Sequence, residues 1–316
     1  MDFSRARLLL IGGTISSYAA LLFMASIAGF PVSFEGWLFE ATAFAIVVFA
    51  ASFLALRFNF QQLRPMIECC GCGLLLVVPI SLSTYLSTWT NFPLADDRLS
   101  GWDSWLGVDW PAIMAWIDRH QLLSEALNKA YRSFPYQLLL CPVLLVLSNH
   151  HKRAYEMVGA YALLCFSSAA ISAFFPALGT YAYYQFDASS LQHINATYGY
   201  LFLEEFHAVR NDPNFIWRLP ESQGIVTFPS VHAAVAVLCA WALWPVALLR
   251  YPALVLNLAM GFSAIPAGSH YAVDVVAGMA VAAASIGIIT FATRPVDEKS
   301  NVQPAPAASS SVPAQS

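Results

Sequence analysis

Two histidines in this sequence lie beside residue types that handle phosphate esters. The first, His232, follows Ser230 in the stretch FPSVH, residues 228–232, where an apolar segment begins. Thr227 is expected to cap a helix there, so Ser230 and His232 would lie beside the free N–H groups of its N-terminus, which attract anions. This pattern is typical of an anion site and equally of a capped helix start with an interfacial histidine.

The second histidine, His270, has a carboxylate four residues further on, where the last apolar segment begins. The stretch HYAVD, residues 270–274, ends in Asp274, and this spacing places both side chains on one helix face. A carboxylate in an apolar span is costly unless a partner or a function retains it. Bonded to one ring nitrogen, it would fix the histidine tautomer and leave the other nitrogen free to attack or to transfer a proton. A purely structural His/Asp pair is the alternative.

Two histidines, a serine and a carboxylate at two helix starts predict phosphoryl transfer without a metal or another cofactor. One histidine would attack phosphorus while the other protonates the leaving oxygen. Helix N-termini and nearby arginines would hold the phosphate oxygens as charge develops.

The composition indicates that the bilayer is the solvent of this chain. Of its 316 residues, 58% are hydrophobic and 11% are charged, which is far more apolar than a soluble domain. A net charge of −4 without a basic run argues against nucleic acid as a partner. The six cysteines lie in apolar stretches, so buried free thiols are expected rather than disulfides or a metal site.

Eight segments predict an all-α, polytopic transmembrane helix bundle, because a spanning helix needs about 20 mostly apolar residues. The expected spans are residues 8–30, 35–56, 66–90, 133–149, 155–177, 228–249, 252–267 and 272–293. We divide the chain into N-terminal spans with an outer interfacial loop (1–132), a catalytic transmembrane core (133–294) and a cytoplasmic tail (295–316). The tail is rich in Pro, Ala and Ser and is expected to be disordered.

The distribution of lysine and arginine predicts the orientation, because positive charge accumulates in cytoplasmic loops. One side of the eight-span arrangement receives Arg5, Arg7, Arg57, Arg64, Lys152, Arg153, Arg250, Arg294 and Lys299. Both termini are therefore expected in the cytoplasm, with the histidines and the long loops 91–132 and 178–227 on the outer, periplasmic or luminal face. Four tryptophans in the first loop, at 102, 105, 110 and 116, indicate a helix at headgroup level that covers the active face or only anchors the loop.

The two motifs resemble signatures of the type 2 phosphatidic acid phosphatase superfamily of lipid phosphatases and phosphotransferases. FPSVH is similar to the family's P-S-G-H and HYAVD to its H-x-x-x-D, with one hairpin of spans between them. The resemblance implies a six-helix core toward the C-terminal side. It also implies that His270 is the nucleophile that forms a phosphohistidine, Asp274 its orienting acid, His232 the general acid and Ser230 a phosphate ligand.

The sequence lacks an arginine with which the family binds phosphate. Family members have Ser-Arg before their second histidine, whereas this chain has Ser263 and Ala264 at these positions. Arg210 and Arg218, in the loop before the sixth span, are the expected replacements, and solvated loop charges are the alternative.

Two further comparisons with the family refine the expectation. Its K-x6-R-P signature is approached by Arg57 to Arg64-Pro65, but the predicted topology puts this stretch across the membrane from the histidines, so we treat the match as coincidence. The missing arginine and the aromatic Tyr271 after His270 are more similar to the inositol phosphorylceramide synthase branch. That branch transfers a phosphoryl headgroup to a lipid alcohol. For this chain, water is the alternative acceptor.

The sequence thus predicts a membrane enzyme, a phosphotransferase or phosphatase whose partners are a lipid phosphate substrate and the bilayer. A transporter or flippase of a phosphorylated lipid or solute, without catalysis, is the alternative. Transporters place polar or broken helices near the midplane. The mid-span positions of this chain are nearly all apolar, which favours the enzyme.

Overall fold

The computed structural model describes residues 4–60 and 62–295, and their regular structure is helical apart from one isolated bridge between Val32 and Trp217. Among the described residues, six helices are long and apolar enough to cross a membrane. They are α1 (Ser4–Ile27), α2 (Trp37–Arg57), α3 (Leu63–Leu75) continued by α4 (Val77–Trp89), α9 (His151–Ser172), α14 (Arg250–Gly268) and α15 (Ala272–Ala292). The prediction of an all-helical, multi-pass membrane protein is confirmed for these residues.

The predicted spans 133–149 and 228–249 correspond to shorter helices. α8 (Phe134–Leu147) has 14 residues and α13 (Val231–Leu243) has 13, whereas a span needs about 20. α8 follows α7 (Gln121–Arg132) after a bend of 57°, because the ring and missing N–H of Pro135 prevent an unbroken helix. The bent pair would make a seventh span if it crosses as one unit, and the count of eight stays a prediction.

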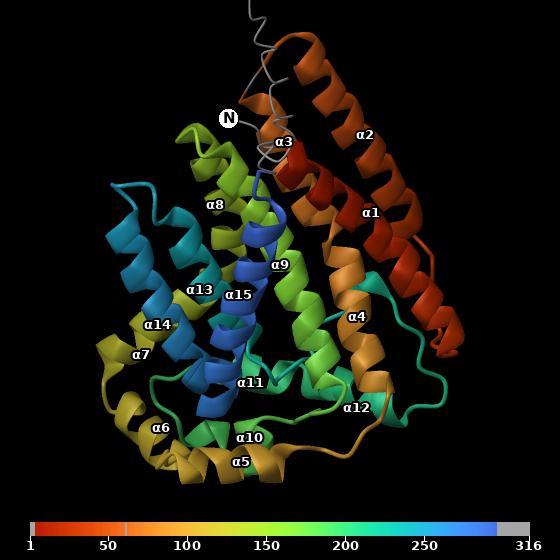
Figure 1. Ribbon diagram of the computed structural model, residues 1–316. Helices are drawn as coiled ribbons and strands as arrows, with labels where there is room; N and C mark the ends of the chain where they lie inside the picture. The colour runs from red at the N-terminus through yellow and green to blue at the C-terminus, as the bar shows by residue number, and fades with distance from the viewer. Residues whose placement is uncertain (1–3, 61, 296–316) are drawn as a thin grey trace, which may run out of the picture.

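The long helices run between two ends of the bundle (Figure 1). α1 begins where α15 ends, and there Arg5 Nη1 donates a hydrogen bond of 2.8 Å to the backbone carbonyl of Arg294. The α2–α3 junction and the α8–α9 turn lie at this end too (Figure 1). We call it the terminal end. The side of the membrane that the terminal end faces stays a prediction. The predicted disordered tail lies outside the described part of the chain from residue 296 onward.

Short helices from both long loops cover the opposite end of the bundle (Figure 1). They are α5 (Asp96–Trp105), α6 (Trp110–Asp118), α10 (Thr180–Tyr183), α11 (Thr197–Leu201) and α12 (Leu203–Asn211), with 3₁₀ turns at Ala188–Ser190 and Leu219–Glu221. The side chains of Trp102, Trp105 and Trp116 are exposed there while Trp110 is buried. An exposed aromatic layer at one end suits the headgroup region of a bilayer.

A buried carboxylate ties four helices together near the terminal end. Glu68 on α3 is only 2% exposed. It accepts hydrogen bonds from Arg7 Nε at 2.7 Å, Arg64 Nε at 3.1 Å and the Tyr155 hydroxyl at 2.6 Å. Ser52 on α2 donates a further bond to the same carboxylate. Because a buried charge needs such partners, α1, α2, α3 and α9 are held in one register.

The centre of the bundle is formed by α9, α13 and α15, and the N-terminal helices α1 and α4 pack on α9. On α15 the small residues Gly278, Ala282 and Ser285 form one buried stripe, which lets neighbouring helices approach closely. Asp274 begins this stripe and therefore points into the bundle.

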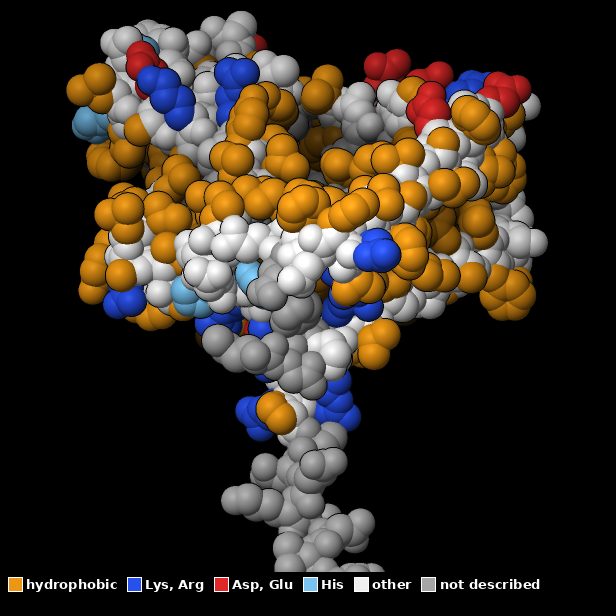
Figure 2. Space-filling model, turned by 90° about the horizontal axis from the view of Figure 1, so that it is seen from above, with side chains coloured by type: hydrophobic (Ala, Val, Ile, Leu, Met, Phe, Trp, Pro, Cys, Tyr) orange, Lys and Arg blue, Asp and Glu red, His pale blue; other side chains and the backbone are white. Residues whose placement is uncertain are grey.

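The molecular surface and the thiols agree with a membrane environment. In the view from above, hydrophobic side chains occupy large areas of the described surface, with other and charged side chains between them (Figure 2). All six cysteines are free, and all except the half-buried Cys70 are buried, which confirms the prediction of free thiols. The division of the chain at residues 132 and 294 stays a prediction.

Candidate active site

His270 lies in the connection between α14 and α15, not in a helical turn. α14 continues through Gly268, and Ser269 then reverses the chain with a φ of 60°, a left-handed conformation that is uncommon for serine. α10 holds this reversal, because Thr180 N donates to the Ser269 carbonyl and Tyr181 N donates to Ser269 Oγ, each over 2.9 Å. The expectation that His270 and Asp274 share one helix face is corrected: Tyr271 is the N-cap, and α15 begins at Ala272.

The pair is formed by this cap geometry. His270 Nδ1 lies 3.1 Å from Asp274 Oδ2, and the same oxygen accepts from Tyr271 N over 3.0 Å. His270 is 4% exposed and Asp274 is fully buried. A carboxylate at Nδ1 selects the tautomer that donates from this nitrogen, so Nε2 presents a lone pair.

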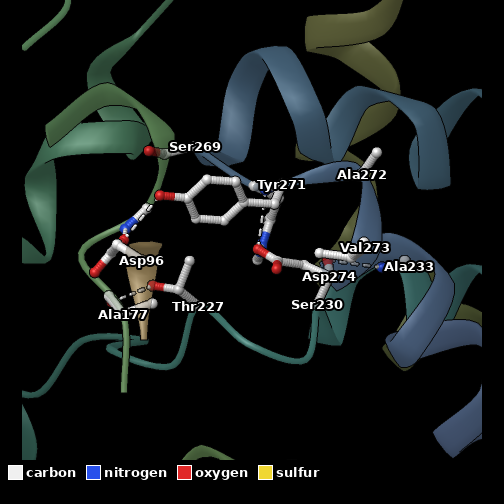
Figure 3. Close-up of polar contacts among 12 residues, drawn as sticks. Asp96, Ala177, Thr227, Ser230, Ala233, Ser269, Tyr271, Ala272, Val273 and Asp274 are labelled. Atoms are coloured by element: carbon white, nitrogen blue, oxygen red, sulfur yellow. Dashed lines mark hydrogen bonds and ion pairs between the residues drawn. The ribbon is translucent and has the colours of Figure 1, made fainter. Parts of the chain in front are cut away.

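Two aspartates of α5 hold the start of α15. Asp103 accepts from the backbone N–H groups of Ala272 at 2.8 Å and Val273 at 2.9 Å, two of the free donors of a helix N-terminus. Asp96 accepts from the Tyr271 hydroxyl over 3.0 Å (Figure 3). The connection between α14 and α15, which contains His270, is therefore held by α5 as well as by α10.

Burial and hydrogen bonding act in opposite directions on the pKa of these two aspartates. Burial raises the pKa of both carboxyl groups above the ordinary value, while hydrogen bonds from backbone N–H groups act to lower it. For Asp96 these donors are Leu178 N at 2.9 Å and Gly179 N at 3.0 Å. The sequence analysis did not identify either residue; their seven-residue spacing, which puts both on one face of a helix, was the available signal.

The first motif forms the start of α13 and packs directly on the second. Ser230, not Thr227, is the N-cap, and its Oγ accepts from Ala233 N over 3.3 Å. The expected cap at Thr227 is wrong, because the Thr227 hydroxyl donates instead to the Ala177 carbonyl over 3.0 Å (Figure 3). Ser230 N donates to the backbone carbonyl of Asp274 over 3.0 Å. The two helix starts are thus hydrogen-bonded to each other.

A glycine permits this close approach. A Cβ atom at Gly278 would lie only 2.1 Å from the Ser230 carbonyl oxygen, so any side chain at this position would push α15 away from the start of α13. The sequence analysis did not single out Gly278, because its role depends on a contact between two separate helices.

Aromatic rings from the α7–α8 bend fix the ring of His232. The Tyr131 ring stacks on it with centroids 4.0 Å apart and planes inclined by 9°. The Phe134 ring lies 4.4 Å away at an angle of 36°. These two residues were not identified from the sequence, since a bend 100 residues before His232 in the chain brings them there.

Both histidines line one cavity of about 350 Å³, a size in the range of small-molecule sites. Its wall combines aromatic rings, hydroxyl groups and aliphatic side chains from α4, α7, α8, α9, α11, α13, the end of α14 and the segment before α13. The residues are Ile80, Thr84, Tyr131, Phe134, Tyr161, Cys165, Ser168, Ala169, Tyr198, Phe202, Gly224, Val226, Thr227, Val231, His232, Gly268 and His270. The hydroxyl of Ser168 is buried without a hydrogen-bond partner among the described residues, so it is available to a ligand.

The other predicted phosphate ligands lie away from this wall. Ser230 is fully buried and used as the cap. Arg210 Nη2 donates to the Phe92 carbonyl over 2.9 Å, and Arg218 Nη1 lies 4.0 Å from Glu221 Oε2. Neither arginine is among the residues that line the cavity, and the buried Ala264 occupies the position of the family arginine.

A helical membrane bundle that places two histidines, one of them paired with a buried carboxylate, on a single cavity is typical of an integral membrane phosphoryl-transfer protein. Residues 97–288 match the PAP2 superfamily, and because the match covers more than half of the chain, the chain belongs to this superfamily. No curated protein and no solved structure matches it. The matched region includes nearly all of α5 and both histidine motifs and leaves out α1 to α4.

Proposed function

We propose that this protein is a membrane lipid phosphotransferase or phosphatase that works through a phosphohistidine on His270 and needs no metal. The observation that carries the proposal is the buried contact of 3.1 Å between His270 Nδ1 and Asp274, with His232 on the wall of the same cavity. Superfamily membership supports a lipid phosphate ester as the substrate.

In the first step, His270 Nε2 attacks phosphorus, and a P–N bond forms as the P–O bond to the leaving lipid alkoxide breaks. Asp274 stabilises the imidazolium that develops, as the carboxylate of a catalytic triad does. His232 donates its proton to the leaving oxygen. In the second step, neutral His232 takes a proton from the acceptor hydroxyl, which attacks the phosphohistidine and releases His270.

Phosphate binding is assigned to the start of α13, because the first N–H groups of α15 already donate to Asp103. The N-terminus of α13 at Ser230 carries the positive end of the helix dipole, and the hydroxyl of Ser168 faces the same cavity. Arg210 and Arg218 remain the proposed cations; either must leave its present partner and turn toward the cavity when substrate binds. This would couple binding to movement of the segment 202–222.

The acceptor is inferred from the resemblance to the inositol phosphorylceramide synthase branch. We therefore propose transfer to a lipid alcohol rather than to water.

The proposed orientation puts both termini in the cytoplasm and the histidine cavity on the outer face. A cysteine introduced for Gln223 should then react with a membrane-impermeant thiol reagent added outside intact cells; labelling only after lysis contradicts this orientation.

The assay uses the purified full-length protein, a phospholipid radiolabelled in its phosphate, several alcohols and EDTA. Lipid chromatography should show the label moving to an alcohol or to inorganic phosphate, with His270→Ala inactive. Label on a new lipid supports phosphotransfer, and free phosphate supports hydrolysis. Full activity of His270→Ala, or activity that is lost in EDTA and restored by a divalent cation, would refute the proposal.

A further inference from the structure

A second hollow, of about 260 Å³, opens on the side of the bundle between α3, α4, α8 and α9. Cys70, Gly73, Leu74 and Val77 follow one another along its wall on α3 and α4. With a rise of about 1.5 Å per residue, these positions extend over roughly 10 Å. The hollow is thus an elongated groove that runs along the helix direction, and we call it the lateral groove.

The rim of the lateral groove faces the bilayer. Leu74 is 51% exposed, Val77 48% and Leu139 of α8 49%. All three are aliphatic residues on membrane helices, so lipid chains surround them. A lipid chain can therefore enter the groove sideways without meeting a polar group.

The lateral groove adjoins the histidine cavity. Phe134 and Tyr161 line both hollows. The ring of Phe134 also lies 4.4 Å from the ring of His232. These two rings thus form the wall that the groove and the cavity share, and a chain reaching from His232 into the groove would pass beside them. A third hollow, between α1, α4 and α9, borders the cavity only through Ala169.

We propose that the lateral groove seats an acyl chain of the lipid whose phosphate lies between the two histidines. The inference rests on the proposed function and adds that the substrate carries a long chain and enters from the side of the bundle. Within a bilayer the chain gains little from leaving its lipid neighbours, because both surroundings are apolar. The groove therefore acts by holding phosphorus in line with His270, since small misplacements of a reacting group reduce the rate strongly.

The test fills the groove with a side chain. A Cβ atom at Gly73 meets only Val158 Cγ1 at 3.9 Å, so Gly73→Leu fits the backbone and extends into the groove. Ala170→Leu is the matched control, because Ala170 is exposed in the third hollow. Each variant is assayed with a long-chain lipid phosphate and with a soluble phosphate ester that has no chain.

Gly73→Leu should lower kcat/KM for the long-chain substrate about tenfold or more, because a misplacement of about 1 Å can cost about a hundredfold in rate, and should leave the soluble ester within about twofold. Ala170→Leu should change neither. Equal rates of wild type and Gly73→Leu on the long-chain lipid, or equal losses on both substrates, overturn the proposal while the phosphotransfer assignment stands.

A binding measurement separates this inference from the catalytic one. A lipid phosphate with a diazirine in its acyl chain is photo-crosslinked to the wild-type protein, and the modified peptides are mapped. Crosslinks on 69–77 and 134–139 support the groove even in a protein that shows no turnover. Crosslinks confined to 17–24 and 83–90 would place the chain in the third hollow and contradict the proposal.

Discussion

At the scale of single residues, the two histidines differ in their surroundings, and this difference assigns their parts. His270 has a carboxylate on Nδ1 at 3.1 Å, which orients the ring and stabilises a cation. His232 has aromatic rings instead, with Tyr131 stacked at 4.0 Å. A ring packed in this way is held in place but receives no anionic support, which suits a group that gives up its proton.

The proton-donor role of His232 predicts a dependence on the leaving group. His232→Gln should slow transfer from an alkyl phosphate by about 10²–10⁴-fold, the usual contribution of a general acid. Nitrophenolate leaves without a proton, so a nitrophenyl phosphate ester should be affected far less. Steady-state kinetics with both esters measures the difference. Equal losses of rate on the two esters would show that His232 is not the general acid.

At the scale of elements, α5 acts as a support for the reactive connection. Its Asp103 accepts from the first two N–H groups of α15, and its Asp96 accepts from Tyr271. Neither aspartate lines the cavity, so both act through the position of His270. The exposed Trp102 and Trp105 lie on the same helix, which links the site to the membrane surface.

Replacement of Asp103 tests this support. In Asp103→Asn one amide oxygen must serve two N–H donors, and the negative charge at the start of α15 is lost. We expect kcat to fall about tenfold with KM unchanged, since a slightly misplaced nucleophile slows chemistry without weakening binding. Asp97→Asn on the exposed face of α5 is the control. A rise in KM with an unchanged kcat would mean that Asp103 binds substrate.

A pH dependence is expected where α6 meets the long loop before α11. Asp118 accepts from the N–H groups of Gln192, His193 and Ile194 at 2.8–3.2 Å. Partial burial opposes ionisation, but these three donors lower the pKa of Asp118 below its ordinary value of 3.8. The ionised carboxylate therefore stabilises the docked loop above about pH 4, and this stabilisation is lost as the pH falls through the lowered value.

Hydrogen exchange at residues 190–195 measures this effect. After correction for the intrinsic rates, protection should be constant from pH 7 to about pH 5, should decline below the ordinary pKa of a carboxyl group, and should be lost below the lowered pKa of Asp118. In the Asp118→Asn variant, the amide hydrogens of residues 190–195 should exchange quickly at every pH. Protection that is unchanged at the acid end would show that other contacts hold the loop.

The elements also show how far the sequence could predict the site. The spacing within 228–232 and 270–274 located the two motifs, because their chemistry depends on near neighbours in the chain. The contacts of Asp96 with Tyr271 and of Tyr131 with His232 join residues about 100 or more positions apart. Such contacts depend on how the helices pack, which local spacing does not determine.

At the scale of the whole molecule, the candidate active site and the Glu68 network lie toward opposite ends of the bundle. The cavity with the histidines lies toward the end covered by short helices, and the buried Glu68 network ties α1, α2, α3 and α9 near the other end. Arg64 is used in this network, which supports the interpretation of the Arg57 to Arg64-Pro65 stretch as unrelated to phosphate binding. Composition predicted the membrane bundle correctly. It did not predict the lengths of α8 and α13, because the prolines at their boundaries act through local geometry.

This separation predicts that Glu68 affects stability and not catalysis. Glu68→Gln leaves the partly buried Arg7 and Arg64 without their anion; breaking a fully buried pair costs about 3–5 kcal/mol, and this is the upper bound here. The Tm in detergent should fall, while the folded fraction keeps the kcat of the wild type. Glu40→Gln, at an exposed position of α2, is the control and should change neither. An unaltered Tm, or a kcat lost in folded Glu68→Gln protein, would contradict this division.

The central claim is that His270 carries the phosphoryl group. The most direct measurement is to mix the purified protein with a lipid labelled in its phosphate, in EDTA, and to quench the reaction with alkali, in which phosphohistidine is stable. Mass spectrometry should then find the phosphoryl group on His270, on a peptide that loses it in mild acid, and should find none in His270→Ala. Phosphate on another residue, or turnover by wild type without any labelled protein under conditions where a phosphohistidine standard survives, would contradict the account.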